Sequence, residues 1–218
     1  SKNQQHEDRM LALETLAGME SDEALSALFR RWDMTAEKER EDRAEKEYLA
    51  KLLVAKGEGM LGQLRAHNDR SVNVTWPIQV MKDVVDDEEV VSEILRVLIA
   101  EGKRLASFKP EKKVTLLRLL QAHEDPRIPP AAVPFLDDFD ESVRYEAAEL
   151  LALRHHDGTV DALVARLGHE EEDSARVRGA ILGALATIDP DLGPHRKTID
   201  KHMVEGWSMG KDGKLQAP

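Results

Sequence analysis

The sequence contains no cysteine, few aromatic residues and no long apolar run. Its 218 residues include 0 Cys, 3 Trp, 2 Tyr and 4 Phe. The lack of cysteine excludes disulfides, thiolate metal sites and cysteine nucleophiles. The longest mostly apolar stretch, Val90 to Ala100, is interrupted by polar residues and falls far short of the ~20 residues that cross a bilayer. The first residues also lack the apolar segment of a signal peptide, so we expect a cytoplasmic protein.

The charge and the apolar content indicate an acidic globular chain. There are 31 Lys and Arg against 42 Asp and Glu, which gives a net charge of −11. A hydrophobic content of 41% is too high for intrinsic disorder, and a charged content of 33% is too high for a membrane protein. With so few aromatics, the core must come from Leu, Val, Ile and Ala, which suit helix packing. This composition favours an all-α fold.

Two segments of the chain repeat one pattern. When residues 140–151 are aligned with 173–185, Val143-Arg144 falls on Val177-Arg178 at an offset of 34. Both segments begin with acidic and Ser residues suited to capping a helix, and both then place small or aliphatic residues three and four apart. Each segment therefore predicts an amphipathic helix.

The repeat extends over most of the chain as helical hairpins. The predicted second helices begin near residues 36, 75, 110, 141 and 174, at spacings of 39, 35, 31 and 33. Their predicted first helices cover residues 22–32, 58–67, 88–101, 131–136 and 159–167. Stacked hairpins of this period form solenoids. We predict one all-α domain over residues 1–204, a right-handed α-solenoid of about five hairpins with capping helices at both ends (residues 1–20 and 193–204), then a C-terminal tail at 205–218.

The repeats resemble those of the HEAT family, particularly the short HEAT-like repeats of bacterial proteins. The resemblance rests on residues 136–144 and on Asp173 with Val177-Arg178, and it covers roughly residues 127–188. In that family, aspartates and arginines form a ladder between adjacent hairpins. The resemblance assigns this structural role to Asp138, Asp140, Arg144, Asp173 and Arg178.

The resemblance also implies a function in binding rather than in catalysis. Most HEAT-like arrays are scaffolds, so we expect a non-catalytic adaptor that binds a protein partner along the concave surface of its second helices. Aromatic and Arg residues dominate protein interfaces, and the candidate contacts are Trp76, Arg118, Tyr145 and Glu149. For each of them, packing against the next hairpin is the alternative. Trp207, in the tail, either caps the last hairpin or belongs to a docking segment.

Three other classes were weighed against the adaptor. HEAT-like deoxyhypusine hydroxylase binds iron through His-Glu pairs at the start of its second helices, where this chain has Tyr145-Glu146 and Gly179-Ala180. We therefore predict no catalytic residue, metal site or cofactor. A HEAT-like cofactor-binding protein similar to phycobilin lyases and a nucleic-acid binder similar to HEAT-like DNA glycosylases remain alternatives. The partner's identity and the oligomeric state stay open.

Overall fold

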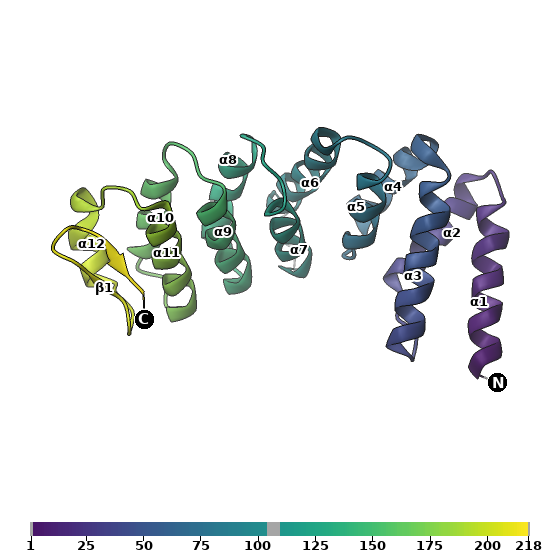
Figure 1. Ribbon diagram of the computed structural model, residues 1–218, viewed down its shortest axis with the longest axis horizontal. Coiled ribbons are helices and arrows are strands. Elements are labelled where there is room, and N and C mark those ends of the chain that lie inside the picture. The colour runs from purple at the N-terminus through teal and green to yellow at the C-terminus, as the bar shows by residue number, and fades with distance from the viewer. Residues whose placement is uncertain (1, 104–109, 218) are drawn as a thin grey trace. The chain divides into compact units, whose positions relative to one another are not determined.

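The computed structural model describes residues 2–103 and 110–217, leaving out residues 1, 104–109 and 218. Within the described range it contains twelve α-helices, three short 3₁₀ turns and one β-hairpin of two-residue strands (Figure 1). The prediction of an all-α chain is confirmed, with that hairpin as an addition. No helix among the described residues is long and apolar enough to span a bilayer.

The chain divides into two compact units, one ending at Val97 and the other beginning at Leu98. The boundary falls inside α6 (Asp87–Gly102). The first unit otherwise consists of α1 (Lys2–Ala17), α2 (Asp22–Asp33), α3 (Glu39–Val54), the 3₁₀ turn η1 (Gly57–Met60), α4 (Leu61–Arg70) and α5 (Thr75–Lys82).

Helices of the first unit pack with helices two places along the chain. Helix α2 contacts α4, and α3 contacts α5, while α1 lies against both α2 and α3 (Figure 1). Fully buried aliphatic side chains fill the space between them, among them Leu28, Leu49, Leu64 and Ile78. First helices therefore pack on first helices and second helices on second helices, as the repeat predicts.

The second unit continues with α7 (Pro110–Leu120), α8 (Ile128–Ala132), the 3₁₀ turn η2 (Val133–Asp137), α9 (Glu141–Leu153), α10 (Thr159–Leu167), α11 (Ala175–Ile188), the 3₁₀ turn η3 (Gly193–His195) and α12 (Arg196–Lys201). Here α7, α9 and α11 pack in that order, while η2, α10 and α12 form the other layer. Fully buried Leu117, Val143, Leu151 and Ile181 belong to its core.

Local capping explains where the two aligned helices begin. The Asp140 carboxylate accepts hydrogen bonds from the backbone N–H groups of Ser142 and Val143, and the Ser174 hydroxyl accepts one from Val177. These contacts satisfy amides that have no partner inside a helix. Helix α11 ends at Ile188 and is followed by Asp189, which adopts the left-handed conformation with φ 53°.

Several predicted helices have different bounds in the structure. The helix expected over 58–67 is the 3₁₀ turn η1 followed by α4, which ends at Arg70. The helix expected over 131–136 is α8 followed by η2, because Pro134 has no N–H to continue an α-helix. Helix α3 begins at Glu39 and not at Ala36. The N–H of Ala36 donates a hydrogen bond of 2.7 Å to the Asp42 carboxylate, so Ala36 lies before the helix. The helix expected over 193–204 is the turn η3 followed by the short α12.

The C-terminal tail forms a β-hairpin, which the sequence did not predict. Strands β1 (Ser208–Met209) and β2 (Leu215–Gln216) pair antiparallel, with Ser208 opposite Gln216. Gly213 takes φ +81° in the connecting turn, a conformation that glycine adopts without strain. Two-residue strands are too short to show an alternating pattern, which explains why the sequence gave no sign of them.

Candidate interaction surface

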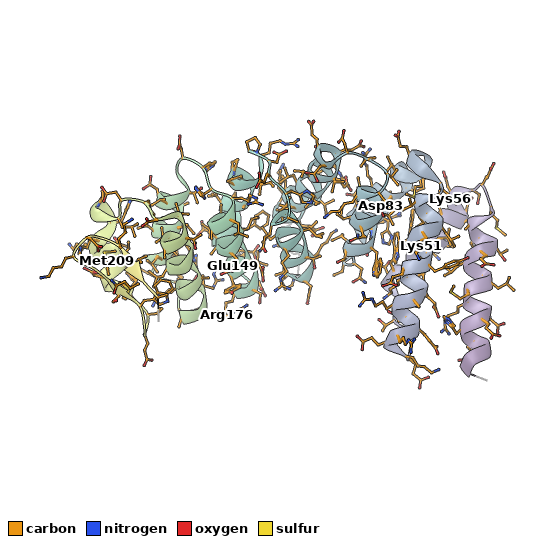
Figure 2. The ribbon with its side chains drawn as sticks, in the orientation of Figure 1. Lys51, Lys56, Asp83, Glu149, Arg176 and Met209 are labelled. Carbon is orange, nitrogen blue, oxygen red and sulfur yellow. The ribbon has the colours of Figure 1, made fainter. Side chains whose placement is uncertain are left out.

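Two of the predicted contact residues lie on one face of α9. Tyr145 and Glu149 are one helical turn apart, and both are partly exposed. The Arg176 guanidinium of α11 lies 4.0 Å from the centre of the Tyr145 ring, a cation–π contact. Figure 2 labels Arg176 and Glu149 on their helices. Burial and the charge of Glu149 raise the pKa of the Tyr145 hydroxyl. The tyrosine is therefore held between a cation on one helix and a carboxylate on its own.

Arg118 reaches the same helix from α7. Its Nη2 lies 2.5 Å from Oε1 of Glu146, an α9 carboxylate that is almost fully buried, while the Arg118 side chain is 61% exposed. This hydrogen bond raises the pKa of Arg118. The arginine thus neutralises a buried charge while leaving much of its surface open.

These contacts define a surface that crosses three consecutive second helices. It consists of Arg118 from α7, Tyr145, Glu146 and Glu149 from α9, and Arg176 from α11, and we call it the α9 surface. Sequence reasoning found three of the five. It missed Glu146 and Arg176. Arg176 aligns with Ser142 at the repeat offset of 34, so the repeated pattern gave no sign of it.

Trp76 belongs to the first unit, on α5. It lines a cavity of about 340 Å³ together with Glu47, Ala50, Lys51 and Val54 of α3 and Asp83 after α5. The α3 residues are spaced three and four apart, so they form one stripe of that helix facing the tryptophan. Figure 2 labels Lys51 and Asp83 at this cavity. Trp76 therefore contributes to both packing between second helices and an open depression beside them.

The predicted ladder residues surround a buried carboxylate that the sequence reasoning did not select. Arg144 donates from Nε and Nη2 to the carboxylate of Glu172, at 2.8 and 3.1 Å, and from Nη1 to the backbone carbonyls of Asp138 and Phe139. Arg178 donates to the backbone carbonyl of Glu172. The acid that meets Arg144 is therefore Glu172, and neighbouring Asp173 contributes only through its charge.

The remaining predicted ladder aspartates have other partners. Asp138 accepts a hydrogen bond from Lys113 Nζ at 2.7 Å and one from the N–H of Asp140. Asp140 caps α9, as described above. Both hold the turn before α9 in place, so their role is to fix the start of that helix rather than to pair with an arginine side chain.

Glu172 accepts hydrogen bonds from arginines of two helices. Besides Arg144 of α9, it accepts a hydrogen bond from Arg166 of α10 at 2.8 Å, and Arg166 also meets Asp137 at 3.2 Å. Burial alone would raise the pKa of Glu172, but its hydrogen bonds to both arginines outweigh that effect and lower it. The run Glu170-Glu171-Glu172-Asp173 hinted at such a site, yet nothing in the sequence indicated which carboxylate would face inward.

Trp207 lies against the last second helix. Its ring atoms Cζ2 and Cη2 lie 3.9 Å from the position that a Cβ on Gly183 of α11 would occupy. Two further contacts attach the tail, an ion pair between Lys214 and Asp189 and a hydrogen bond from Arg196 to the Gly210 carbonyl. Of the two roles weighed for Trp207, this placement favours the cap.

Among the described residues, no group of three or more His, Asp or Glu side chains is arranged to hold a metal ion. The three His-Glu dipeptides lie in different places, His6-Glu7 within α1, His123-Glu124 after α7 and His169-Glu170 after α10. His6 instead meets Glu45 of α3, with Nδ1 2.6 Å from Oε1. The three His-Glu pairs, which are the candidate iron ligands, therefore lie in different segments of the chain.

Paired helices packed layer on layer define the class of helical-repeat proteins. A comparison with protein families matches residues 129–198, from α8 into α12, to HEAT repeats. The resemblance stated from the sequence is confirmed for this part of the chain: residues 129–198 match HEAT repeats. No curated protein and no solved structure matches the chain.

Proposed function

We propose that this protein is a non-catalytic adaptor that binds a protein partner through the surface of its second helices. The observation that carries the proposal is the α9 surface, where an aromatic ring, two half-exposed arginines and a carboxylate converge from three helices. Aromatic and arginine side chains are the usual centres of protein interfaces. HEAT repeats supply the extended face on which such residues line up.

The proposed architecture extends the observed packing of hairpins. In it, residues 1–204 form one right-handed α-solenoid of about five hairpins, with α1 as the N-terminal cap and the β-hairpin as the C-terminal one. The second helices then line a concave surface, to which Trp76 also contributes. Packing of first helices on first helices and second on second within each unit supports this arrangement.

The charge of the chain favours a partner with a basic patch. A net charge of −11 repels nucleic acids and other acidic surfaces, and complementary charges increase the rate at which partners meet. The proposed adaptor acts in the cytoplasm, without a cofactor.

The test is affinity capture from lysate of the natural host with quantitative mass spectrometry, comparing wild type with Tyr145→Ala and Arg118→Gln. The second variant removes the guanidinium charge from the surface and keeps an amide donor in the side chain. Lys197→Gln is the matched control, because it removes an exposed positive charge from α12 in the other helical layer.

A partner that Lys197→Gln retains and the two α9-surface variants lose is the expected result. Circular dichroism must show that all variants melt like wild type. Equal retention of the partner by all three variants would remove the α9 surface from the proposal. If the protein instead carried a metal or a chromophore and showed enzymatic activity, it would be an enzyme and not an adaptor.

A further inference from the structure

A cavity of about 310 Å³ lies between α2 and α4, two first helices of the first unit. Its lining includes Phe29, Arg30 and Asp33 of α2, and His67, Arg70 and Ser71 at the end of α4. Within each set the residues are three or four positions apart, so each set forms one stripe of its helix. The two stripes face each other across the cavity, because α2 packs against α4.

The cavity has a buried floor and a cationic rim. Phe29, His67 and Ser71 are buried and form the floor. Arg30 and Arg70 are exposed and form the rim, one from each helix. A hollow with an apolar base and a few convergent polar groups is the usual form of a binding site.

Neither rim arginine pairs with a carboxylate in the described part of the chain, although most of the other described arginines do. Arg70 donates from Nε to the carbonyl of Ala66, one turn earlier, which leaves its two terminal nitrogens available. The helix dipole favours basic residues in the last turns of α2 and α4, so each arginine is stable there without a carboxylate. That effect does not require both arginines to line one cavity.

Asp33 is the only acidic residue in the lining of this cavity. Its carboxylate accepts a hydrogen bond from the Ser71 hydroxyl, and its Oδ1 lies 3.9 Å from Nε2 of His67. Asp33 is therefore engaged with the floor and not with the rim. Two guanidinium charges against one carboxylate leave the cavity with a net positive charge.

Two guanidinium groups at one hollow suit an anion with several acceptor oxygens. Guanidinium groups donate paired hydrogen bonds to phosphate, and clusters of arginine recognise phosphorylated side chains in many proteins. A phosphoryl group carries nearly two negative charges at pH 7. A volume of about 310 Å³ lies at the low end for ligand pockets, so it suits one group of a larger partner. The net charge of −11 opposes polyanions such as nucleic acids.

We propose that this cavity, the Arg30–Arg70 cavity, binds the phosphoryl group of a phosphorylated side chain in a protein partner. The two guanidinium groups hold the phosphoryl oxygens, and the rest of that side chain lies over Phe29. Because the chain as a whole is acidic, the residues flanking the phosphorylated one are basic or uncharged. The proposal rests on the proposed adaptor function only in that the partner is a protein. Its site belongs to first helices of the first unit and not to the α9 surface.

The test measures binding of the full chain to degenerate peptide libraries with phosphoserine or phosphotyrosine fixed at the centre. Matching libraries carry serine, tyrosine or glutamate at that position. Selected peptides are then titrated by fluorescence anisotropy against wild type, Arg30→Gln, Arg70→Gln and Asp33→Asn. Arg40→Gln is the matched control, because Arg40 of α3 is also an exposed arginine without a carboxylate partner among the described residues. Urea unfolding checks that each variant is as stable as wild type.

Phosphorylated peptides should bind wild type far more tightly than their unphosphorylated and glutamate counterparts. Arg30→Gln and Arg70→Gln should each lower the affinity about tenfold, and Arg40→Gln should leave it unchanged. Asp33→Asn should raise the affinity severalfold, because it removes a like charge while its amide oxygen can still accept the Ser71 hydroxyl. Tyr145→Ala should not affect phosphopeptide binding, so failure of this proposal and failure of the α9 surface can be told apart.

Four results would overturn the proposal. The first is equal binding of phosphorylated and unphosphorylated peptides. The second is an equal loss of affinity in Arg40→Gln, which would show attraction to any surface arginine. The third is weaker binding in Asp33→Asn, which would assign the cavity to a cation. The fourth is inorganic phosphate that competes as strongly as the peptides, which would assign the cavity to the free ion.

Discussion

Arg144 of α9 holds Glu172, which follows α10, through two hydrogen bonds of 2.8 and 3.1 Å. Both groups are buried, Glu172 completely. Because the two residues lie 28 positions apart, the pair fixes one hairpin against the next. A charged pair of this kind sets register as well as contributing energy, since a planar guanidinium donates two parallel hydrogen bonds to a carboxylate in few orientations.

Replacing Glu172 with Ala should strongly destabilise the second unit. The change leaves Arg144 and Arg166 buried without their shared carboxylate, which costs about 3 to 5 kcal/mol in buried pairs of this type. Urea unfolding followed by circular dichroism measures the loss. Glu171→Ala, an exposed neighbour, should change the free energy of unfolding by less than about 0.5 kcal/mol. Equal effects of the two changes would contradict a structural role for Glu172.

The first unit should lose stability in acid. The pKa values of Asp42 and Glu45 are both about 2: burial opposes ionisation, but hydrogen bonds from Lys46 to Asp42 and from Arg9 to Glu45, among others, outweigh it. Since the folded pKa lies below the unfolded one, their stabilisation is complete above about pH 5 and is lost as the pH falls toward 2. For fully buried Glu45 the contribution is on the order of 3 kcal/mol.

Amide hydrogen exchange at a series of pH values would measure this loss separately for α2 and α3. Glu45→Gln should reduce the dependence of stability on pH between about 5 and 2, because the amide does not titrate. An unchanged slope in that variant would show that Glu45 does not carry the effect.

Helix α1 should detach when its polar contacts are removed. Of its described side chains only Leu13 is fully buried, and Arg9 makes three hydrogen bonds with Glu45. Arg9→Gln should therefore abolish exchange protection in α1 while leaving α4 and α5 protected. Arg43→Gln, which removes an exposed i,i+4 pair with Glu47, should leave α1 unchanged. High salt should also lower the exchange protection of α1, as Arg9→Gln does, because salt screens the charges of Arg9 and Glu45.

The C-terminal β-hairpin should depend on Trp207. Trp207→Ala removes the aromatic contact with α11 at Gly183 and should lower stability by about 1 to 3 kcal/mol, since the ring is only partly buried. Thermal denaturation and exchange at residues 208–216 would measure it. Leu153→Ala is the control, with little change expected at an exposed position. Full protection of the hairpin in Trp207→Ala would argue against the cap.

Most helices of the fold were predictable because their signals are local. The bounds of α10 match the expectation of 159–167, since Gly158 takes a positive φ before it and aliphatic spacing continues through Leu167. Pro134 changed the outcome for 131–136, where a helix of the expected length became α8 and a 3₁₀ turn. The β-hairpin escaped prediction because it is held by contacts with α11 and α12 and not by its own pattern.

The candidate surface was predictable only in part, for a related reason. Tyr145 and Arg118 stand out by residue type, whereas Arg176 matters because α11 places its guanidinium over the tyrosine ring. In the sequence Phe139 is only one residue of the repeat motif, whereas the structure exposes it fully at a turn that Arg144 and Asp140 hold by hydrogen bonds.

The sequence by itself determined the all-α class, the hairpin period and the HEAT-like repeats, because caps and apolar spacing act within a turn or two of helix. Only the tertiary structure decided which of four consecutive acidic residues would be buried with Arg144 and where the tail would pack. Those outcomes depend on contacts between side chains that are about thirty residues apart in the sequence and belong to different hairpins. Local patterns such as caps and apolar spacing do not specify contacts of that kind.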